Sequence, residues 1–237
     1  MPQTLTPLDP DLPTLRGDLP AALAHPADDP LAELDRQVDA LVALGVAAVA
    51  GLAADDLRAA VAPLRDRLPD AVARPSGAQD PDDRVPFVLV VPADPNDAVP
   101  AMRRGGRHGV SVLGREEATG FRPLDDVAVP AGPAYLLLDV DTGSDLRGEA
   151  PATALEVVRG RGRTPLTMAE GIALVTVRPD MLRPNRCFSL LASRDGSKRV
   201  PAVWISERRP KLGWCWDGNP HTWLGSASAA GRLGADG

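Results

Sequence analysis

Residues that could do chemistry are concentrated in two short stretches of this chain. The first is LLLDVDTGSD, residues 136–145, where Asp139 and Asp141 follow an apolar run typical of a buried strand. The second is KLGWCWDGNPHTWLGS, residues 211–226, which holds three of the four tryptophans. Paired carboxylates suit acid-base chemistry or a hard cation, and a thiol near an imidazole suits nucleophilic catalysis or zinc. The candidate catalytic residues are therefore Asp139, Asp141, Cys215 and His221.

Three chemistries fit the acidic stretch. The run Asp141-Thr142-Gly143 resembles the active-site turn of aspartic proteases, and one such turn per chain means that a protease would need a homodimer. The Asp-x-Asp spacing is similar to that of haloacid-dehalogenase phosphatases, but Thr142 and Gly143 stand in the reverse of the order in that motif. Asp139, Asp141 and Asp145 could together hold a hard cation. The non-catalytic alternative is an Asx-type turn whose carboxylates accept hydrogen bonds from backbone amides.

The Trp-rich stretch predicts a strand over 211–216. Side chains alternate along a strand, so Trp214 and Trp216 share one face while Cys215 points to the other. If that face is open it is a binding site, and the predicted ligand-binding residues are Trp214, Trp216, Asn219, His221 and Trp223. If it is covered, the tryptophans anchor the core.

The two cysteines are expected to remain thiols. If the strands containing Cys187 and Cys215 flank a third strand, they lie about 9 to 10 Å apart. That separation is too large for a disulfide and unsuitable for a shared metal ion. We therefore predict a buried thiol at Cys215, no metal site and no cofactor.

Charge is divided unevenly along the chain. Residues 1–150 carry 13 basic and 25 acidic side chains, and residues 151–237 carry 13 basic and 7 acidic ones. The basic residues are scattered through predicted strands and turns, which argues against a nucleic-acid partner. One small anion-binding turn is predicted around Gly105 and Gly106, although it matches neither the Walker pattern nor GxGxxG. Its residues are Arg103, Arg104 and Arg107.

Helix signals occur mainly in the N-terminal part of the chain. Asp29 and Pro30 form an N-cap and first turn before leucines and valines at helical spacing, which predicts a helix over 30–44. A second helix begins near Ala53, and the two form a predicted helical hairpin. Further short helices are predicted over 96–105, over 151–160 and after the capping box Thr167 to Glu170.

Strand signals dominate the remainder. Apolar runs predict strands at 85–91, 110–113 and 134–139. Strands at 187–192, 200–206 and 211–216 form an antiparallel meander, with an Asp195-Gly196 turn in its first connection. The predicted fold class is α+β: an N-terminal helical hairpin followed by a mixed domain ending in this antiparallel β-meander. The predicted segments are a Pro-rich extended arm over 1–29, the hairpin over 30–68, a linker over 69–84, the α+β main domain over 85–232 and a tail over 233–237.

A family resemblance rests on the strings RTPLTMAEGIAL, CFSLLASR, VPAVWIS and PKLGWCWDGNPHTWLG. They resemble a family of uncharacterised actinobacterial proteins of unknown function. YLLLDVDTG and the helical N-terminus are similar to the same family, so the resemblance covers about residues 30–232. It implies a bacterial, cytosolic protein and supplies no activity or ligand.

The N-terminal residues show no basic region followed by an apolar core, as a secretory signal would. The uncharged run at 40–54 is shorter than the roughly 20 residues that span a bilayer. We therefore expect a soluble cytoplasmic protein with no membrane partner.

Two functions fit these patterns. The first is a binding or interaction protein without catalysis, whose partner is a small molecule or a protein and which could form a homodimer. The alternative is a hydrolase that uses the Asp139/Asp141 turn, either as an aspartic-protease-like dimer or with the assistance of a metal.

Overall fold

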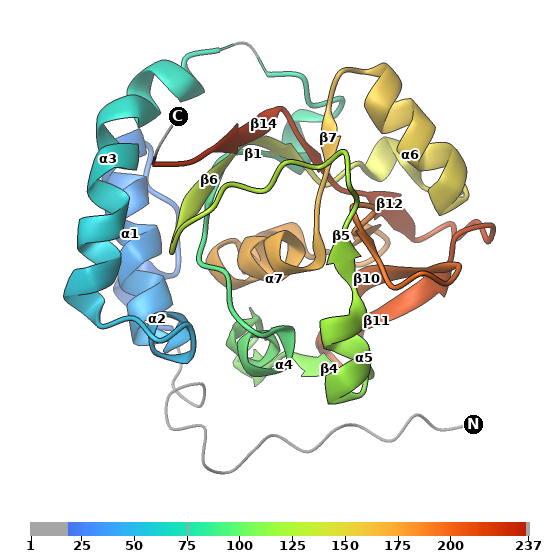
Figure 1. The fold of residues 1–237 in the computed structure, drawn as a ribbon, viewed down its shortest axis with the longest axis horizontal. Coiled ribbons are helices and arrows are strands. Elements are labelled where there is room, and N and C mark those ends of the chain that lie inside the picture. Colours follow the sequence, from blue (N-terminus) through green and yellow to red (C-terminus); the bar gives the residue numbers. More distant parts are fainter. Residues whose placement is uncertain (1–18, 75, 236–237) are drawn as a thin grey trace.

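The computed structural model describes residues 19–74 and 76–235 of the chain (Figure 1). Most of the predicted arm over 1–29 and the last two residues of the predicted tail lie outside these residues. Two helices, α1 (Pro30–Ala43) and α3 (Ala54–Val72), form the predicted N-terminal hairpin, with the short α2 (Val46–Val49) between them. The side chain of Asp29 accepts a hydrogen bond from the Ala32 amide over 2.9 Å, as its predicted role as N-cap requires. Local capping signals therefore placed the start of α1 correctly.

A first sheet lies against this hairpin. It contains β1 (Arg84–Val90), β6 (Tyr135–Asp141), β7 (Thr164–Pro165), β13 (Ser228–Ala229) and β14 (Gly231–Leu233). Its order is β1-β6-β13-β7, and β14 also pairs with β6. The antiparallel pair β1 and β6 joins two of the predicted strands, with Phe87 opposite Leu138. Both strands are almost entirely buried, as their continuous apolar runs predict.

The free edge of β1 is covered by a side chain of α1. Gln37, which is fully buried, donates from Nε2 to the Phe87 carbonyl over 3.3 Å and accepts from the Leu89 amide at Oε1 over 2.7 Å. The side chain of this one glutamine thus makes two of the backbone hydrogen bonds that a neighbouring strand would otherwise make with β1. The contact fixes α1 on the sheet and satisfies backbone groups that would otherwise be buried without partners.

The second sheet contains the predicted meander. Its strands are β4 (Val110–Ser111), β8 (Cys187–Ser189), β10 (Arg199–Ser206), β11 (Arg209–Trp216) and β12 (Leu224–Ser226), in the order β12-β8-β10-β11-β4. β8, β10 and β11 pair antiparallel, as predicted. β12 and β4 pair in parallel with β8 and β11 at the two edges, which the local sequence pattern did not predict.

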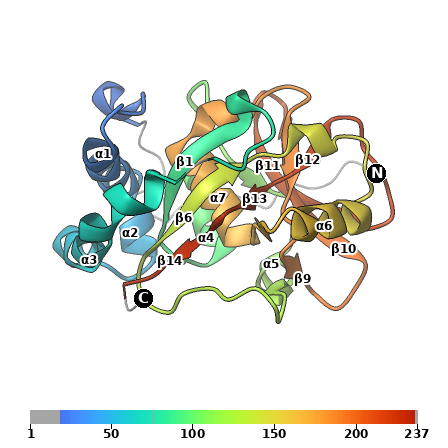
Figure 2. The same ribbon diagram turned by 90° about the horizontal axis from the view of Figure 1, so that it is seen from above.

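The chain does not end at the meander, contrary to our prediction. After β11 it forms β12, β13 and β14, and the last two belong to the first sheet. The final strands are only two or three residues long, so they carry too little alternation to be recognised in the sequence. The C-terminal segment therefore links the two sheets, as the arrangement in Figure 2 shows.

Helix α7 (Met168–Val177) lies in the middle of the molecule (Figures 1 and 2). A Cβ added to Gly171 would lie 2.2 Å from Cδ2 of Leu190, so a larger residue would force the buried Leu190 side chain to move. Glu170 completes the predicted capping box by accepting from the Thr167 amide over 2.7 Å. Its carboxylate also accepts from the Tyr135 hydroxyl over 2.9 Å and from Arg232 Nε over 2.6 Å, which ties α7 to the first sheet.

Shorter elements complete the fold. The predicted helix at 151–160 is α6 (Pro151–Gly160), whereas the region 96–105 contains only α4 (Pro95–Ala98) and a 3-10 turn before a hairpin. The fold class is α+β, as predicted, and no helix among the described residues is long and apolar enough to cross a membrane. The other elements are α5 (Arg115–Gly120), β2 (Arg103–Arg104), β3 (Arg107–His108), β5 (Arg122–Pro123), β9 (Ser193–Arg194), η1 (Ala21–Leu23), η2 (Pro81–Asp83), η3 (Val99–Ala101), η4 (Ser144–Leu146) and η5 (Pro179–Met181).

Candidate functional site

Asp139, the first of the two strand-end carboxylates, is held by four donors. Its oxygens accept from Ser76 Oγ over 2.6 Å, the Gly77 amide over 2.8 Å, Arg84 Nε over 2.9 Å and Arg163 Nη1 over 2.9 Å. Burial by itself would raise the pKa of Asp139, but these hydrogen bonds outweigh it and lower the pKa to about 2. The side chain is therefore a charged anchor at physiological pH, with little capacity left to bind a metal or substrate.

Asp141 lies deeper and is bound by backbone amides alone. The residue is 2% exposed, and its carboxylate accepts from the Gln79 amide over 3.0 Å and the Gly143 amide over 2.7 Å. Burial raises its pKa, and the nearby charge of Asp83 acts in the same direction. This is the Asx-type turn that we considered as the non-catalytic alternative. Both oxygens of this carboxylate are thus occupied by backbone amides.

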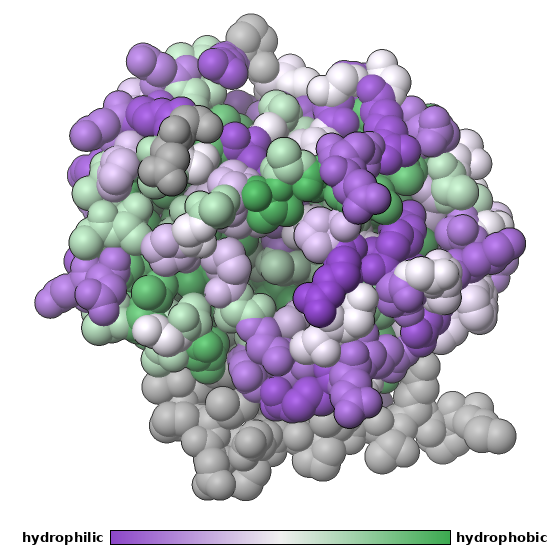
Figure 3. Space-filling model, in the orientation of Figure 1, coloured by the Kyte–Doolittle hydropathy of each residue, from purple (hydrophilic) through white to green (hydrophobic). Residues whose placement is uncertain are grey.

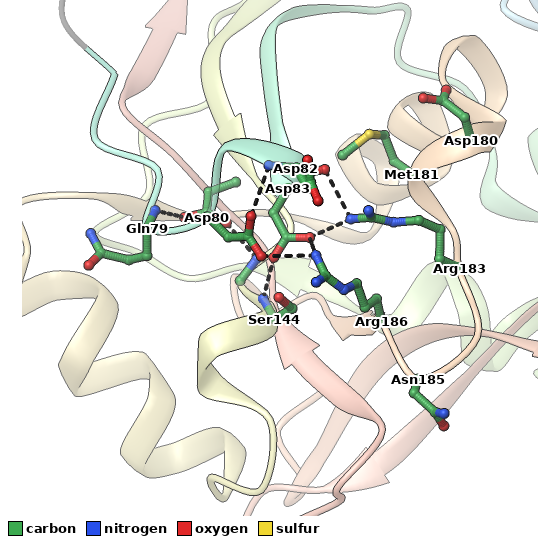
Figure 4. A network of polar contacts seen from close by, with 12 residues as sticks. Gln79, Asp80, Asp82, Asp83, Ser144, Asp180, Met181, Arg183, Asn185 and Arg186 are labelled. Atoms are coloured by element: carbon green, nitrogen blue, oxygen red, sulfur yellow. Dashed lines mark hydrogen bonds and ion pairs between the residues drawn. The ribbon is translucent and has the colours of Figure 1, made fainter.

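Asp83 is a third buried carboxylate, which the sequence did not single out. It is fully buried and accepts from the Ser144 amide over 3.0 Å and from Arg186 Nη1 over 3.1 Å, while Arg183 pairs with the same oxygen. Figure 4 shows the two arginines reaching this carboxylate from the segment after η5. Although burial would raise the pKa of Asp83, hydrogen bonds from the turn at Ser144 and the charge of Arg183 lower it. No local pattern marks Asp83, because its partners lie about 60 and 100 positions away.

Two glycines allow the turn after Asp141 to meet strand β12. Gly143 has a left-handed backbone, and a Cβ there would lie 2.1 Å from the Ser226 carbonyl oxygen. A Cβ at Gly225 would lie 2.3 Å from the Gly143 carbonyl oxygen. The two stretches singled out in the sequence therefore do come together, through backbone packing at these glycines.

Trp214 and Trp216 share one face of β11, as predicted. Their ring centroids lie 4.8 Å apart at 70°, in an edge-to-face arrangement. The guanidinium of Arg199 lies 5.4 Å from the Trp214 ring and 5.7 Å from the Phe121 ring. Trp216 is 47% exposed, whereas Trp214 is half-buried. We call Trp214, Trp216, Arg199 and Phe121 the Trp216 surface.

Arg199 and Phe121 were not predicted as members of this surface. Arg199 lies directly opposite Trp216 in the β10–β11 register. The predicted strands over 200–206 and 211–216 did not place it there, because Ser206 pairs with Arg209 and the turn is shorter than predicted. Phe121 follows α5 and comes from far away in the sequence, where no signal indicates this contact. The guanidinium of Arg199 also forms ion pairs with Glu117 and Asp195, which hold it in place.

The remaining predicted ligand-binding residues lie elsewhere. Trp223 contacts Trp204 with ring centroids 6.2 Å apart, and His221 lies 5.3 Å from the Trp223 ring. Trp204 packs over Gly213, so it lies on the opposite face of the sheet from Trp214. The structure therefore divides the predicted pocket into two aromatic groups, and the exposed Asn219 lies in the turn that connects them.

Cys215 and His221 show no catalytic pairing. Cys215 is buried, with Sγ 3.8 Å from Ser189 Oγ and 3.7 Å from the Val200 carbonyl oxygen. Burial raises the pKa of the Cys215 thiol and also the pKa of the Cys187 thiol. Neither thiol is therefore activated as a nucleophile. Within residues 19–74 and 76–235, no group of three His, Cys, Asp or Glu side chains is placed to hold a metal ion.

The predicted anion-binding turn forms the hairpin β2–β3, but its arginines diverge. Arg103 is buried and donates to the carbonyls of Pro100 and Met102. Arg107 is exposed and donates to the Glu207 carbonyl over 3.2 Å, while Arg104 is half-buried. Two of the three guanidinium groups are thus engaged by backbone carbonyls.

Comparison with known proteins provides a family and no activity. No curated protein and no solved structure matches the chain. DUF5701, a family of unknown function, matches residues 40–235. That range begins within α1 and includes both sheets, the buried carboxylates and the Trp216 surface. The chain therefore belongs to the DUF5701 family, a family of unknown function, as its resemblance to such a family predicted.

Proposed function

We propose that this protein is a non-catalytic binding protein that docks a protein partner on the Trp216 surface. The observation that carries the proposal is the exposure of Trp216. Among the described residues, Trp216 is the one large apolar side chain that is exposed to solvent. Isolated apolar residues are common on surfaces, but an exposed tryptophan supported by a second tryptophan and an arginine is typical of an interface anchor.

Residue types and rigidity both favour a protein partner. Tryptophan and arginine are enriched among the residues that dominate interface energies. The edge-to-face contact with Trp214 limits the motion of the Trp216 ring, and Glu117 and Asp195 fix Arg199. A surface that is already ordered loses little conformational entropy on binding.

The charges of the Trp216 surface suggest what the partner presents. Arg199 is neutralised by two carboxylates, so the exposed ring is bordered by a balanced polar rim. Apolar centres inside polar rims are the usual anatomy of protein interfaces. We infer that the partner contributes an apolar side chain to the Trp216 ring and uncharged polar groups around it.

The hydrolase alternative receives less support. Asp139 is held by four donors, and Asp141 is 2% exposed and accepts from two backbone amides, so both carboxylates are already engaged within the protein. The discriminating variant is Asp141→Asn. If it abolished cleavage in a broad substrate screen while melting temperature and oligomeric state stayed unchanged, the non-catalytic proposal would be wrong. Cytoplasmic location, actinobacterial origin and a homodimer remain predictions from the sequence.

The proposal can be tested by panning a peptide display library on the purified full-length chain. We expect enriched peptides to share an apolar or aromatic position and to be lost on Trp216→Ala. The matched control is Asn219→Ala, which alters an exposed turn residue of the same stretch and should retain the same peptides. Enrichment that is equal on both variants would reject the Trp216 surface as the binding site.

A further inference from the structure

A cavity of about 120 Å³ lies between the end of α3 and the first sheet. Its walls come from α3, β1, β6 and the turn into β14. In Figure 3, apolar residues show at the surface between α3 and the middle of the molecule, while hydrophilic residues gather toward α6. The cavity shares no residue with the Trp216 surface.

Three arginines line this cavity: Arg74, Arg84 and Arg232. Arg232 is fully used, because it donates to Glu170, Thr164 and the Pro165 carbonyl. Arg84 donates only its Nε hydrogen, to Asp139, so its two terminal nitrogens have no hydrogen-bond partner among the described residues. Arg74 has no ion-pair or hydrogen-bond partner among those residues either. Two guanidinium groups therefore retain unused donors at one cavity.

Asp139, the carboxylate that lines the cavity, balances this positive charge only in part. Asp139 accepts from Arg163 and Arg84 and from two further donors, so its charge is already compensated. Glu170, the carboxylate that binds Arg232, is fully buried. The local balance is thus an excess of positive charge in a chain whose formal net charge is −6.

The remaining lining is apolar. Val72 of α3 and Leu138 of β6 both contribute to the walls, together with small residues of the β14 turn. An inorganic ion would leave these walls without a partner, whereas a short hydrocarbon group would be buried against them. The site therefore suits a ligand with one charged end and one apolar end.

We propose that this cavity binds a small organic oxyanion, with its carboxylate or phosphate head on Arg84 and Arg74 and a short apolar group against Val72 and Leu138. The planar guanidinium fork matches either head because both present paired oxygens. Binding of this ligand does not depend on the partner proposed for the Trp216 surface.

The test is a titration of the full-length ¹⁵N-labelled chain with acetate, butyrate and inorganic phosphate at constant ionic strength. We expect saturable shifts of the Val72 and Gly231 amide signals at millimolar concentrations, with butyrate binding more tightly than acetate. Arg74→Gln and Arg84→Gln should each weaken butyrate binding about tenfold, the usual effect of losing a charge-assisted hydrogen bond. Arg74→Gln keeps the proposal testable if Arg84→Gln perturbs folding, because Arg74 is exposed.

The matched control is Arg122→Gln, which removes an exposed arginine that does not line the cavity. It should leave the butyrate affinity unchanged. The proposal is overturned if none of the three anions produces saturable shifts at these amides. It is also overturned if the shifts are the same in Arg74→Gln, Arg122→Gln and the wild type, which would indicate a general salt effect. Binding of phosphate with no binding of butyrate would reject the apolar half of the site.

Discussion

Arg163 donates from Nη1 to Oδ2 of Asp139 over 2.9 Å, and both side chains are nearly buried. Asp139 has a φ of 47°, a left-handed conformation that costs a non-glycine residue about 1 to 3 kcal/mol. The ion pair, together with Arg84 and the segment Ser76–Gly77, stabilises that conformation. This contact fixes the end of β6 and the turn that follows it.

Asp139 should make the protein less stable in acid. Its pKa is about 2 in the folded chain against 3.8 for an unperturbed aspartate, so the folded state favours the charged form. The stabilisation is complete above about pH 5 and is lost as the pH falls through 2 to about 1, a total of about 2 kcal/mol. Urea unfolding of the wild type and Asp139→Asn should show a stability difference that shrinks over this range. A difference that stays constant between pH 6 and the acid limit would show that the charge of Asp139 is not involved.

Gln37→Ala should destabilise the protein by about 2 to 3 kcal/mol. The variant leaves the Leu89 amide and the Phe87 carbonyl buried without partners, and each such group costs about 1 to 3 kcal/mol. The free energy of unfolding, from urea denaturation, measures the effect. Asp39→Ala is the matched control, since Asp39 is an exposed residue of the same helix and its change should cost less than about 1 kcal/mol. Equal losses in the two variants would mean that the glutamine does not protect the edge of β1.

Gly143→Ala should prevent folding or severely destabilise the folded protein. The left-handed φ of 68° disfavours alanine, and its Cβ would collide with the Ser226 carbonyl. Gly160→Ala is the control, because it places a Cβ in open space at the end of α6 and should be neutral or stabilising. Circular dichroism and thermal melting distinguish the two. A well-folded Gly143→Ala protein would contradict the close packing of this turn on β12.

Local signals predicted the parts of the fold that depend on neighbouring residues. The N-cap Asp29 and the capping box Thr167 to Glu170 placed two helices to within about a residue, and the apolar runs placed β1 and β6. The strands β12, β13 and β14 were missed because two- and three-residue strands are defined by distant partners. The contact of β12 with the turn after β6 likewise depends on the close approach of Gly143 and Gly225, which lie far apart in the sequence.

The sequence likewise predicted those parts of the candidate site that depend on neighbouring residues. Strand alternation placed Trp214 and Trp216 together, but it could not place Trp223 and His221, which follow an irregular turn. The carboxylates Asp139 and Asp141 were found as a pair, whereas the arginines that compensate Asp139 come from other elements. Tertiary contacts decide which carboxylates already accept all the hydrogen bonds they can. The sequence alone therefore left both the hydrolase and the binding protein open.

Stability should separate the two tryptophans of the Trp216 surface. Trp214 is half-buried beneath Arg199, so Trp214→Ala should cost about 3 kcal/mol. Trp216 is 47% exposed, so Trp216→Ala should cost less than about 1 kcal/mol. Chemical denaturation gives both values. If the two losses were equal, Trp216 would be a structural residue and its exposure would not indicate binding.

The role of Trp216 as the anchor for a protein partner is tested by the dissociation constant of a selected peptide, measured for the wild type and for Trp216→Ala. Loss of an interface anchor costs about 2 kcal/mol, so we expect a dissociation constant about 30-fold higher in the variant. Asn219→Ala should bind like the wild type, and the melting temperatures of all three proteins should agree closely. Equal dissociation constants for wild type and Trp216→Ala, with both proteins folded, would show that Trp216 does not anchor the partner.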